Sequence, residues 1–265
     1  MTDYFTETAR MQSYRTDEGG APVDLLRKPD IAKQVVAKAT RKYGEVTDYS
    51  LRHGMFGKIA GCNVFKPEAC RMLFEGFGAG SVLDISAGWG DRLLGALATP
   101  GVRRYLAFDP NTSLKPGHSE MIATFGELAG GGSYEVVYEP FESGPIPEGE
   151  RFDLVFTSPP FFDLEIYESG NPEDHQSLKD HPTFDGWMTG FLLASMAKAW
   201  AHLKPHGHMA IYINDYRNRA ICHSMLAWAD ANLPRVTFVG VVGLEGEGAR
   251  AKTRPCWVWR RGGED

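Results

Sequence analysis

The chain has 265 residues, 43% hydrophobic and 23% charged, which is the balance of an ordinary folded protein rather than of a disordered one. Its net charge of −6 argues against a surface that is basic throughout, as in proteins that grip duplex DNA by many phosphates, although local basic patches are compatible with it. No segment has the apolar length of a membrane span or the apolar core of a secretory signal, so we expect no membrane partner. The four cysteines have no C-x-x-C spacing, which favours a reduced, cytoplasmic protein without a disulfide framework or zinc knuckle.

The first 60 residues are polar and mixed in charge, and we expect them to form a small helical N-terminal extension. The clearest helix covers about 29–43, where Ile31, Val35 and Val36 fall on one side of a helical projection. We expect the remainder, 61–265, to form one domain.

From about residue 81 onward, short apolar runs alternate with helical patterns. We expect strands at 81–86, 103–109, 133–139, 151–158, 208–215, 235–243 and 255–261. We expect helices at 91–98, 111–129, 186–203 and 224–233. This alternation predicts an α/β fold with a doubly wound, mostly parallel, seven-stranded sheet and helices on both faces. A glycine-rich tip joins the last two strands, which are predicted to form an antiparallel hairpin at one edge of the sheet.

A glycine-rich stretch, DISAGWG (84–90), lies between the first expected strand and the helix that follows it. Gly88 and Gly90 would let the backbone approach a ligand closely. Asp109 closes the next strand, where doubly wound folds place a carboxylate that accepts hydrogen bonds from a ribose. The dinucleotide pattern G-x-G-x-x-G is absent, and Asp91 would repel a pyrophosphate. The loop therefore favours a cofactor with a ribose and no phosphate, although a purely structural turn is an alternative.

Two consecutive prolines interrupt the chain in FTSPPFFDLEIY (156–167), directly after an expected strand. Proline cannot donate a hydrogen bond to a sheet, so a central strand must end here. The result should be a rigid corner that presents the Ser158 hydroxyl, the Pro159 carbonyl and the ring of Phe161. The alternative is that the prolines only end the strand and that Phe161 belongs to the core.

Together, DISAGWG and TSPPFF resemble two motifs of class I S-adenosylmethionine-dependent methyltransferases. More narrowly, they look like those of DNA amino-methyltransferases, which modify the exocyclic amine of cytosine or adenine. The resemblance covers roughly residues 60–261 and implies the Rossmann-like methyltransferase fold for 61–265, with S-adenosyl-L-methionine as the cofactor. It implies that the glycine loop binds the methionine end of the cofactor and that Ser158-Pro159-Pro160-Phe161 holds the target amine. GCNVFKPEACRMLF (61–74) resembles the element that completes the methionine pocket.

These patterns assign candidate residues to three roles. The residues expected to contact the cofactor are Phe65, Lys66, Pro67, Asp84, Ser86, Ala87, Gly88, Gly90, Asp109, Pro110 and Glu139. The residues expected to act in catalysis are Ser158, Pro159 and Phe161. The residues expected to contact the substrate are Phe162, Asp163, Tyr167, Arg250, Lys252 and Arg254. The histidines at 202, 206 and 208 follow a common helix-to-strand turn, so we expect no metal site there.

The expected reaction is N-methylation of a planar amino group, with the exocyclic amine of a nucleobase in DNA, single-stranded or flipped out of a duplex, as the leading substrate. An N-methyltransferase for a small molecule or a protein amide is the main alternative. It is favoured by the acidic segment 162–185 and by the lack of a long segment for target recognition. Transfer of the aminocarboxypropyl group from the same cofactor, and a catalytically idle binding subunit, are further alternatives.

Overall fold

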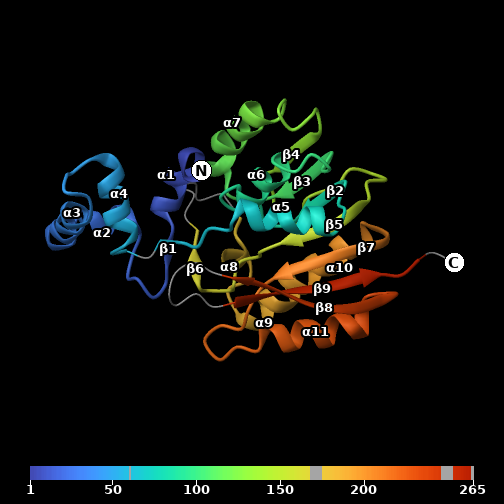
Figure 1. Ribbon diagram of the computed structural model, residues 1–265. Helices are drawn as coiled ribbons and strands as arrows, with labels where there is room; N and C mark the ends of the chain where they lie inside the picture. The colour runs from blue at the N-terminus through green and yellow to red at the C-terminus, as the bar shows by residue number, and fades with distance from the viewer. Residues whose placement is uncertain (60, 168–174, 246–252, 264–265) are drawn as a thin grey trace.

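The computed structural model describes residues 1–59, 61–167, 175–245 and 253–263, and it has the three layers of an α/β protein (Figure 1). Seven strands form its main sheet, in the spatial order β4-β3-β2-β5-β7-β9-β8. The five parallel strands are β2 (Ser81–Asp84), β3 (Arg104–Phe108), β4 (Ser133–Val137), β5 (Phe152–Thr157) and β7 (Leu203–Tyr212). The antiparallel hairpin consists of β8 (Val236–Glu245) and β9 (Thr253–Arg261), and it forms the edge beyond β7. The predicted sheet is therefore confirmed.

Helices cover both faces of the sheet, as predicted (Figure 1). One face carries α5 (Pro67–Gly76), α6 (Asp91–Leu97) and α7 (Lys115–Phe125). The other carries α9 (Phe184–Gly186), the π-helical turn η2 (Trp187–Leu193), α10 (Ala194–Ala201) and α11 (Ile221–Asn232). The helix expected at 111–129 is divided into the short η1 (Thr112–Leu114) and α7, whose first turn contains Pro116. A proline is tolerated at that position because the first backbone N–H groups of a helix have no acceptor within it.

Two apolar clusters, one on each face, hold these layers together. Alternate residues of β5 contribute to both, because successive side chains of a strand point to opposite faces. Phe156 packs in the cluster under α5 and α6, whereas Val155 packs in the cluster that contains Trp187 and Trp200. All four of these side chains are almost completely buried.

The N-terminal residues form α1 (Asp3–Gln12), β1 (Tyr14–Arg15), α2 (Pro22–Leu26), α3 (Pro29–Tyr43) and α4 (Asp48–Phe56). α3 has the bounds that the sequence predicts, since Pro29 begins it and Gly44, with φ 77°, ends it. α1 packs against α7, and β1 pairs antiparallel with β6 (Glu165–Ile166). α2, α3 and α4 enclose a separate cluster that contains Leu25, Val35 and Met55, and they project from the main body (Figure 1).

Among the described residues, no helix combines the length and the apolar character needed to cross a membrane. The short α8 (Ser177–Asp180) follows β6, beyond residues 168–174.

Candidate active site

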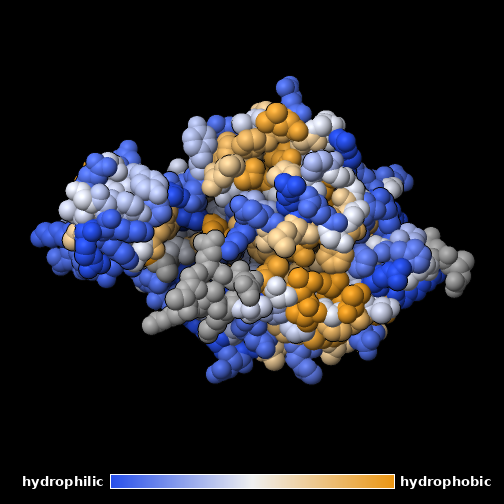
Figure 2. Space-filling model, in the orientation of Figure 1, coloured by the Kyte–Doolittle hydropathy of each residue, from blue (hydrophilic) through white to orange (hydrophobic). Residues whose placement is uncertain are grey.

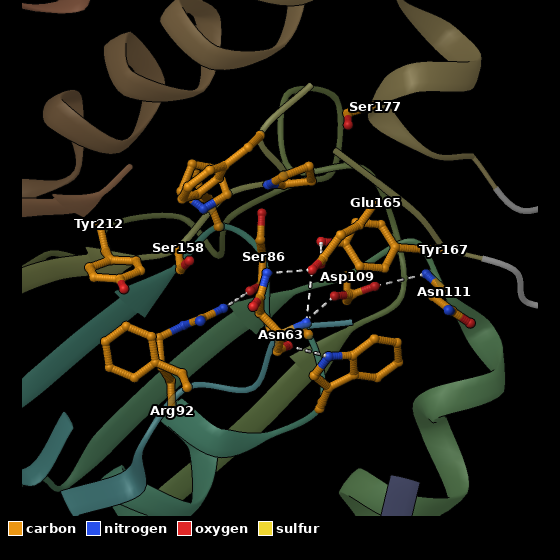
Figure 3. Close-up of a pocket in the computed structure, with 18 of the residues that line it drawn as sticks. Asn63, Ser86, Arg92, Asp109, Asn111, Ser158, Glu165, Tyr167, Ser177 and Tyr212 are labelled. Carbon is orange, nitrogen blue, oxygen red and sulfur yellow. Dashed lines mark hydrogen bonds between the residues drawn. The ribbon is translucent and has the colours of Figure 1, made fainter. Parts of the chain in front are cut away.

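A cavity of about 600 Å³ opens at the carboxyl ends of the parallel strands (Figure 3). It lies where the strand order reverses, since the chain continues from β2 toward β3 on one side and from β5 toward β7 on the other. The loops that leave β2 and β5 therefore diverge, and ligands bind in the resulting crevice of open α/β sheets. The volume is within the range of small-molecule and cofactor sites.

The glycine loop after β2 forms one wall of the cavity, and the peptide groups of Gly88 are held on both sides. Its N–H donates to the Asp109 carboxylate at 2.7 Å, and its carbonyl lies 2.9 Å from Nε2 of His118. Burial lowers the pKa of His118 to about 4, so the ring is neutral near pH 7 and can donate from Nε2. The other ring nitrogen lies 3.1 Å from the hydroxyl of Tyr138. The loop is thus positioned before any ligand binds.

Asp109 directly follows β3 and faces the same cavity. One carboxylate oxygen accepts from the N–H of Gly88 and the other from the N–H of Asn111, at 3.0 Å. Burial raises the pKa of Asp109 to about 6, although the two backbone N–H groups favour its charged form. Each oxygen of a carboxylate has a second acceptor site, so Asp109 can still receive hydrogen bonds from ligand hydroxyl groups.

Asp84 lies below the glycine loop and is completely buried. It accepts hydrogen bonds from Arg92 Nε at 2.7 Å, from the Tyr105 hydroxyl at 2.8 Å and from the N–H of Ser86 at 3.2 Å. Burial alone would lower the pKa of Arg92, but the carboxylate of Asp84 raises it. Arg92 lines the cavity and also donates to the Ser86 carbonyl. Asp84, expected to contact the cofactor, is not among the lining residues and supports the loop through Arg92.

Residues remote in sequence form the wall beside the loop. The Glu165 carboxylate accepts from the backbone and side-chain amide groups of Asn63, at 2.8 and 2.6 Å, and from the Tyr167 hydroxyl at 2.7 Å. The indole N–H of Trp89 donates to the Asn63 carbonyl at 2.9 Å, and its ring meets that of Tyr167 edge-on at 5.9 Å. Sequence reasoning did not identify Asn63, Trp89 or Glu165. Trp89 belongs to the glycine-rich motif, so its position in the sequence was a signal. No local sequence pattern indicates that residues 63 and 165 are hydrogen-bonded.

The corner after β5 forms the opposite wall, with Ser158 beside Tyr212 (Figure 3). The Phe161 ring lies 6.5 Å from that of Tyr212, and Phe65 meets Tyr212 edge-on at 5.0 Å. Tyr212 is the last residue of β7. The strand expected at 208–215 continues past it, so the sequence did not place Tyr212 at the carboxyl edge of the sheet. Arg254, from β9, completes this side.

The two consecutive phenylalanines of the corner point in different directions. Phe161 lines the cavity, whereas Phe162 is 5% exposed and packs against Phe184 and Trp187 in the core. Phe162 has a φ of 54°, an uncommon value for a residue with a side chain. This sharp turn of the backbone directs the two rings apart, and Phe162 anchors the corner instead of facing a ligand.

Asp163 follows this turn and forms an ion pair with Arg219 at 2.6 Å. The Arg219 guanidinium also lies 4.5 Å from the centre of the Phe162 ring. Thr16, next to β1, donates from its hydroxyl to the Asp163 carbonyl. Asp163 therefore stabilises the corner through contacts outside the cavity.

The cavity gathers most of the residues that the sequence predicts. Those that line it are Phe65, Lys66, Ser86, Ala87, Gly88, Asp109, Pro110, Ser158, Pro159, Phe161, Tyr167 and Arg254. Those that are described but are not among its lining residues are Pro67, Asp84, Gly90, Glu139, Phe162 and Asp163. Arg250 and Lys252 lie outside the residues that the structure describes.

The three histidines near the start of β7 have separate partners. His202 contacts the Glu150 carbonyl, His206 contacts Arg260, and His208 lies against Phe77. In the described part of the chain, no group of three or more His, Cys, Asp or Glu side chains is arranged to hold a metal ion.

Similarity to known proteins is found in the structure and not in the sequence. Neither a protein-family model nor a curated protein matches the sequence. The glycopeptide N-methyltransferase MtfA has a similar structure, with a TM-score of 0.50 and 12% identity over 75% of this chain and 97% of that one. TrmN from Thermus thermophilus has a TM-score of 0.48 and 16% identity over 74% of this chain, which spans about half, 48%, of TrmN. A methyltransferase from Pyrococcus furiosus has a TM-score of 0.44 and 16% identity, over 89% and 99% of the two chains. The order and directions of the seven strands, together with the similarity to MtfA, show that the chain has the Rossmann-like methyltransferase fold.

Proposed function

We propose that this chain is an S-adenosylmethionine-dependent N-methyltransferase that acts on a planar amino group, with the exocyclic amine of a nucleobase in DNA as its substrate. The observation that carries the proposal is that one cavity is lined both by the glycine loop with Asp109 and by Ser158, Pro159 and Phe161. In a two-substrate transfer, both reactants must lie in one enclosed space with their reacting atoms in contact.

The residues of the cofactor half fit S-adenosylmethionine. Asp109 offers the acceptor sites that ribose hydroxyl groups need, and the preformed glycine loop lets the cofactor approach the backbone. Phe65 and Arg92 supply an aromatic surface and a cation at the base of the cavity, where a carboxylate and an apolar chain can be held. When bound, S-adenosylmethionine supplies a methyl group that its sulfonium already activates, so the protein needs no strong base.

The corner after β5 carries the acceptor groups that a planar amine requires. The lone pair of such an amine is delocalised into the ring, which makes the nitrogen a poor nucleophile. The Ser158 hydroxyl and the Pro159 carbonyl can each accept one amine hydrogen, which favours a more tetrahedral nitrogen with an available lone pair. The prolines hold these acceptors rigidly. Phe161 and Tyr212 provide aromatic surfaces for the flat ring that bears the amine.

A small molecule or a protein amide is the alternative substrate, supported by the two glutamates among the lining residues, Glu142 and Glu165. Both kinds of substrate would use the same corner, so only an assay of which molecule the enzyme methylates distinguishes the two hypotheses. Aminocarboxypropyl transfer would move the carbon chain of the cofactor instead of its methyl group, and a methyl-specific label detects this difference.

The test is transfer of a labelled methyl group from S-adenosylmethionine to single-stranded DNA, duplex DNA, RNA and a metabolite fraction, by the wild type and Ser158→Ala. We expect label in DNA and a loss of kcat of about 100-fold in the variant, by analogy with removal of one preorganised hydrogen-bonding group. Cofactor affinity should not change. Ser224→Ala, which removes an exposed hydroxyl from α11, is the matched control. Label only in the metabolite fraction would refute the DNA assignment, and full activity of Ser158→Ala would refute the role of the corner.

A further inference from the structure

The three helices α2, α3 and α4, which we call the N-terminal lobe (residues 22–58), carry a charge opposite to that of the rest of the chain. The lobe has eight Lys and Arg residues against four Asp and Glu, a net charge of +4, whereas the whole chain has −6. The other residues therefore have a net charge of −10. On the face shown in Figure 2, the lobe is largely hydrophilic. Such segregation of positive charge is the electrostatic footprint of a polyanion-binding surface.

Most of these cations face solvent and have no acidic partner among the residues that the structure describes. Lys28, Lys33, Arg41, Lys42 and Lys58 are exposed, and none of them takes part in the ion pairs of the described residues. Arg41 and Lys42 occupy the last turn of α3, where they also complement the helix dipole. A charge that is not neutralised within the protein remains available for phosphate groups.

Next to Lys42, the lobe presents aromatic rings that its own core does not use. Tyr43, Tyr49 and His53 form a surface cluster, with ring centres 4.5 to 5.6 Å apart. Tyr49 is 62% exposed, and the Lys42 ammonium lies 5.1 Å from the centre of the Tyr43 ring. The apolar core of the lobe is a different cluster, around Val35 and Met55. Exposed aromatic rings beside cations are the surface on which unpaired bases stack while the backbone follows the positive charge.

Contacts between α4 and α1 connect the lobe to the active site. Arg52 of α4 pairs with Asp3 and Glu7 of α1. On the same helix, the Thr6 hydroxyl donates to the carbonyl of Trp89 at 3.0 Å, within the glycine loop. The N-terminal segment also pairs, through β1, with β6, whose Glu165 lines the cavity. The lobe is therefore held in a defined position relative to the cavity.

We infer that the N-terminal lobe binds single-stranded DNA beside the target base, with its phosphates on Arg41 and Lys42 and a base on Tyr49. This inference rests on the proposed function and names the element that recognises the substrate strand. A single strand is favoured because stacking on Tyr49 needs an unpaired base.

The test is the affinity of a fluorescently labelled single-stranded oligonucleotide, measured by anisotropy over a series of salt concentrations. Arg41→Gln with Lys42→Gln should weaken binding and reduce the slope of log affinity against log salt by about 1.4, for two phosphate contacts on a single strand. The matched control is Arg103→Gln with Arg151→Gln. These two exposed arginines directly precede β3 and β5, so they lie at the amino ends of the parallel strands, whereas the cavity lies at the carboxyl ends. Tyr49→Ala should weaken binding roughly fivefold or more, and all variants should bind S-adenosylmethionine like the wild type.

Each outcome separates this inference from the proposed function. If DNA is methylated and the lobe variants bind it as the control does, the lobe inference fails and the proposed function stands. If the wild type binds no oligonucleotide even at low salt, the lobe inference is overturned whatever the enzyme methylates. If duplex and single strand bind equally and Tyr49→Ala has no effect, the single-strand assignment is overturned. A thermal-unfolding curve of each variant ensures that lost binding is not lost folding.

Discussion

Gly88 allows the proposed cofactor site to be tested at a modest cost in stability. Its φ of 58° lies in the left-handed region, where a residue with a Cβ costs roughly 1–2 kcal/mol. A Cβ at this position would have no neighbour closer than 3.9 Å, so no clash within the protein adds to that cost. Gly88→Ala should therefore lower the free energy of unfolding by about 1–2 kcal/mol, a loss in Tm of roughly 2–8 °C for a chain of this size.

The expected effect of Gly88→Ala on cofactor binding is larger. Gly88 lines the cavity, so the added methyl group would occupy space next to the bound cofactor. Inserting a methyl group into a packed site costs about 1–3 kcal/mol, which is a loss of affinity between about 5- and 150-fold. Calorimetric titration with S-adenosylmethionine measures this loss directly.

Gly90→Ala is the comparison, because it should show the opposite balance. Its φ is 90°, and a Cβ there would lie 2.8 Å from the side chain of Met121 and 3.1 Å from His118. Met121 is completely buried and has little room to move, so this variant should lose more stability than Gly88→Ala. Gly90 is not among the residues that line the cavity, so the folded fraction should keep more of its affinity. An unchanged affinity of Gly88→Ala, with a loss in Tm as large as that of Gly90→Ala, would refute this reasoning.

Three further predictions follow from the site. Because burial raises the pKa of Asp109 to about 6, its carboxylate becomes protonated as the pH falls below 6. The affinity for S-adenosylmethionine should then fall by up to tenfold per pH unit, and calorimetry should find no such dependence in Asp109→Asn. Stability has the opposite sign, since a carboxyl whose pKa is raised stabilises the fold below its unfolded pKa of 3.8, and this contribution is lost as the pH rises through about 6. Arg92→Met should lower stability by about 3–5 kcal/mol, or roughly 10 °C in Tm, because Asp84 keeps a buried charge without its partner; a thermal-unfolding shift under about 2 °C would contradict this. Phe161→Ala should raise KM roughly fivefold or more by removing a stacking surface, and steady-state kinetics that show only a lower kcat would exclude that role.

The alternation of strands and helices was readable from the sequence because its signals are local. Apolar runs such as 151–158 are followed by turn residues, and α3 begins at a proline and ends at a glycine. The glycine loop and the double proline were also recognisable, because each restricts the backbone by its own composition. The carboxyl ends of parallel strands share one edge, which is why Gly88, Asp109 and Ser158 line one cavity in the structure.

Other features depend on contacts that no local pattern encodes. Two adjacent phenylalanines look alike in sequence. In the structure, Phe162 has a positive φ and packs against Trp187 in the core, whereas Phe161 lines the cavity. Asp84 looked like a cofactor ligand until its burial with Arg92 placed it behind the loop.

By itself, the sequence determined the α/β class, the parallel core and the two motifs, because each depends on residues close together in the chain. Only the tertiary structure decided that Glu165 meets Asn63, 102 residues away, and that β1 pairs with β6 beside the cavity. It also decided that helices expected to be a mere extension are tied to the glycine loop through Thr6. Such pairings are selected by the free energy of burying polar groups with satisfied hydrogen bonds in the whole fold, and a local stretch of sequence does not contain that free energy.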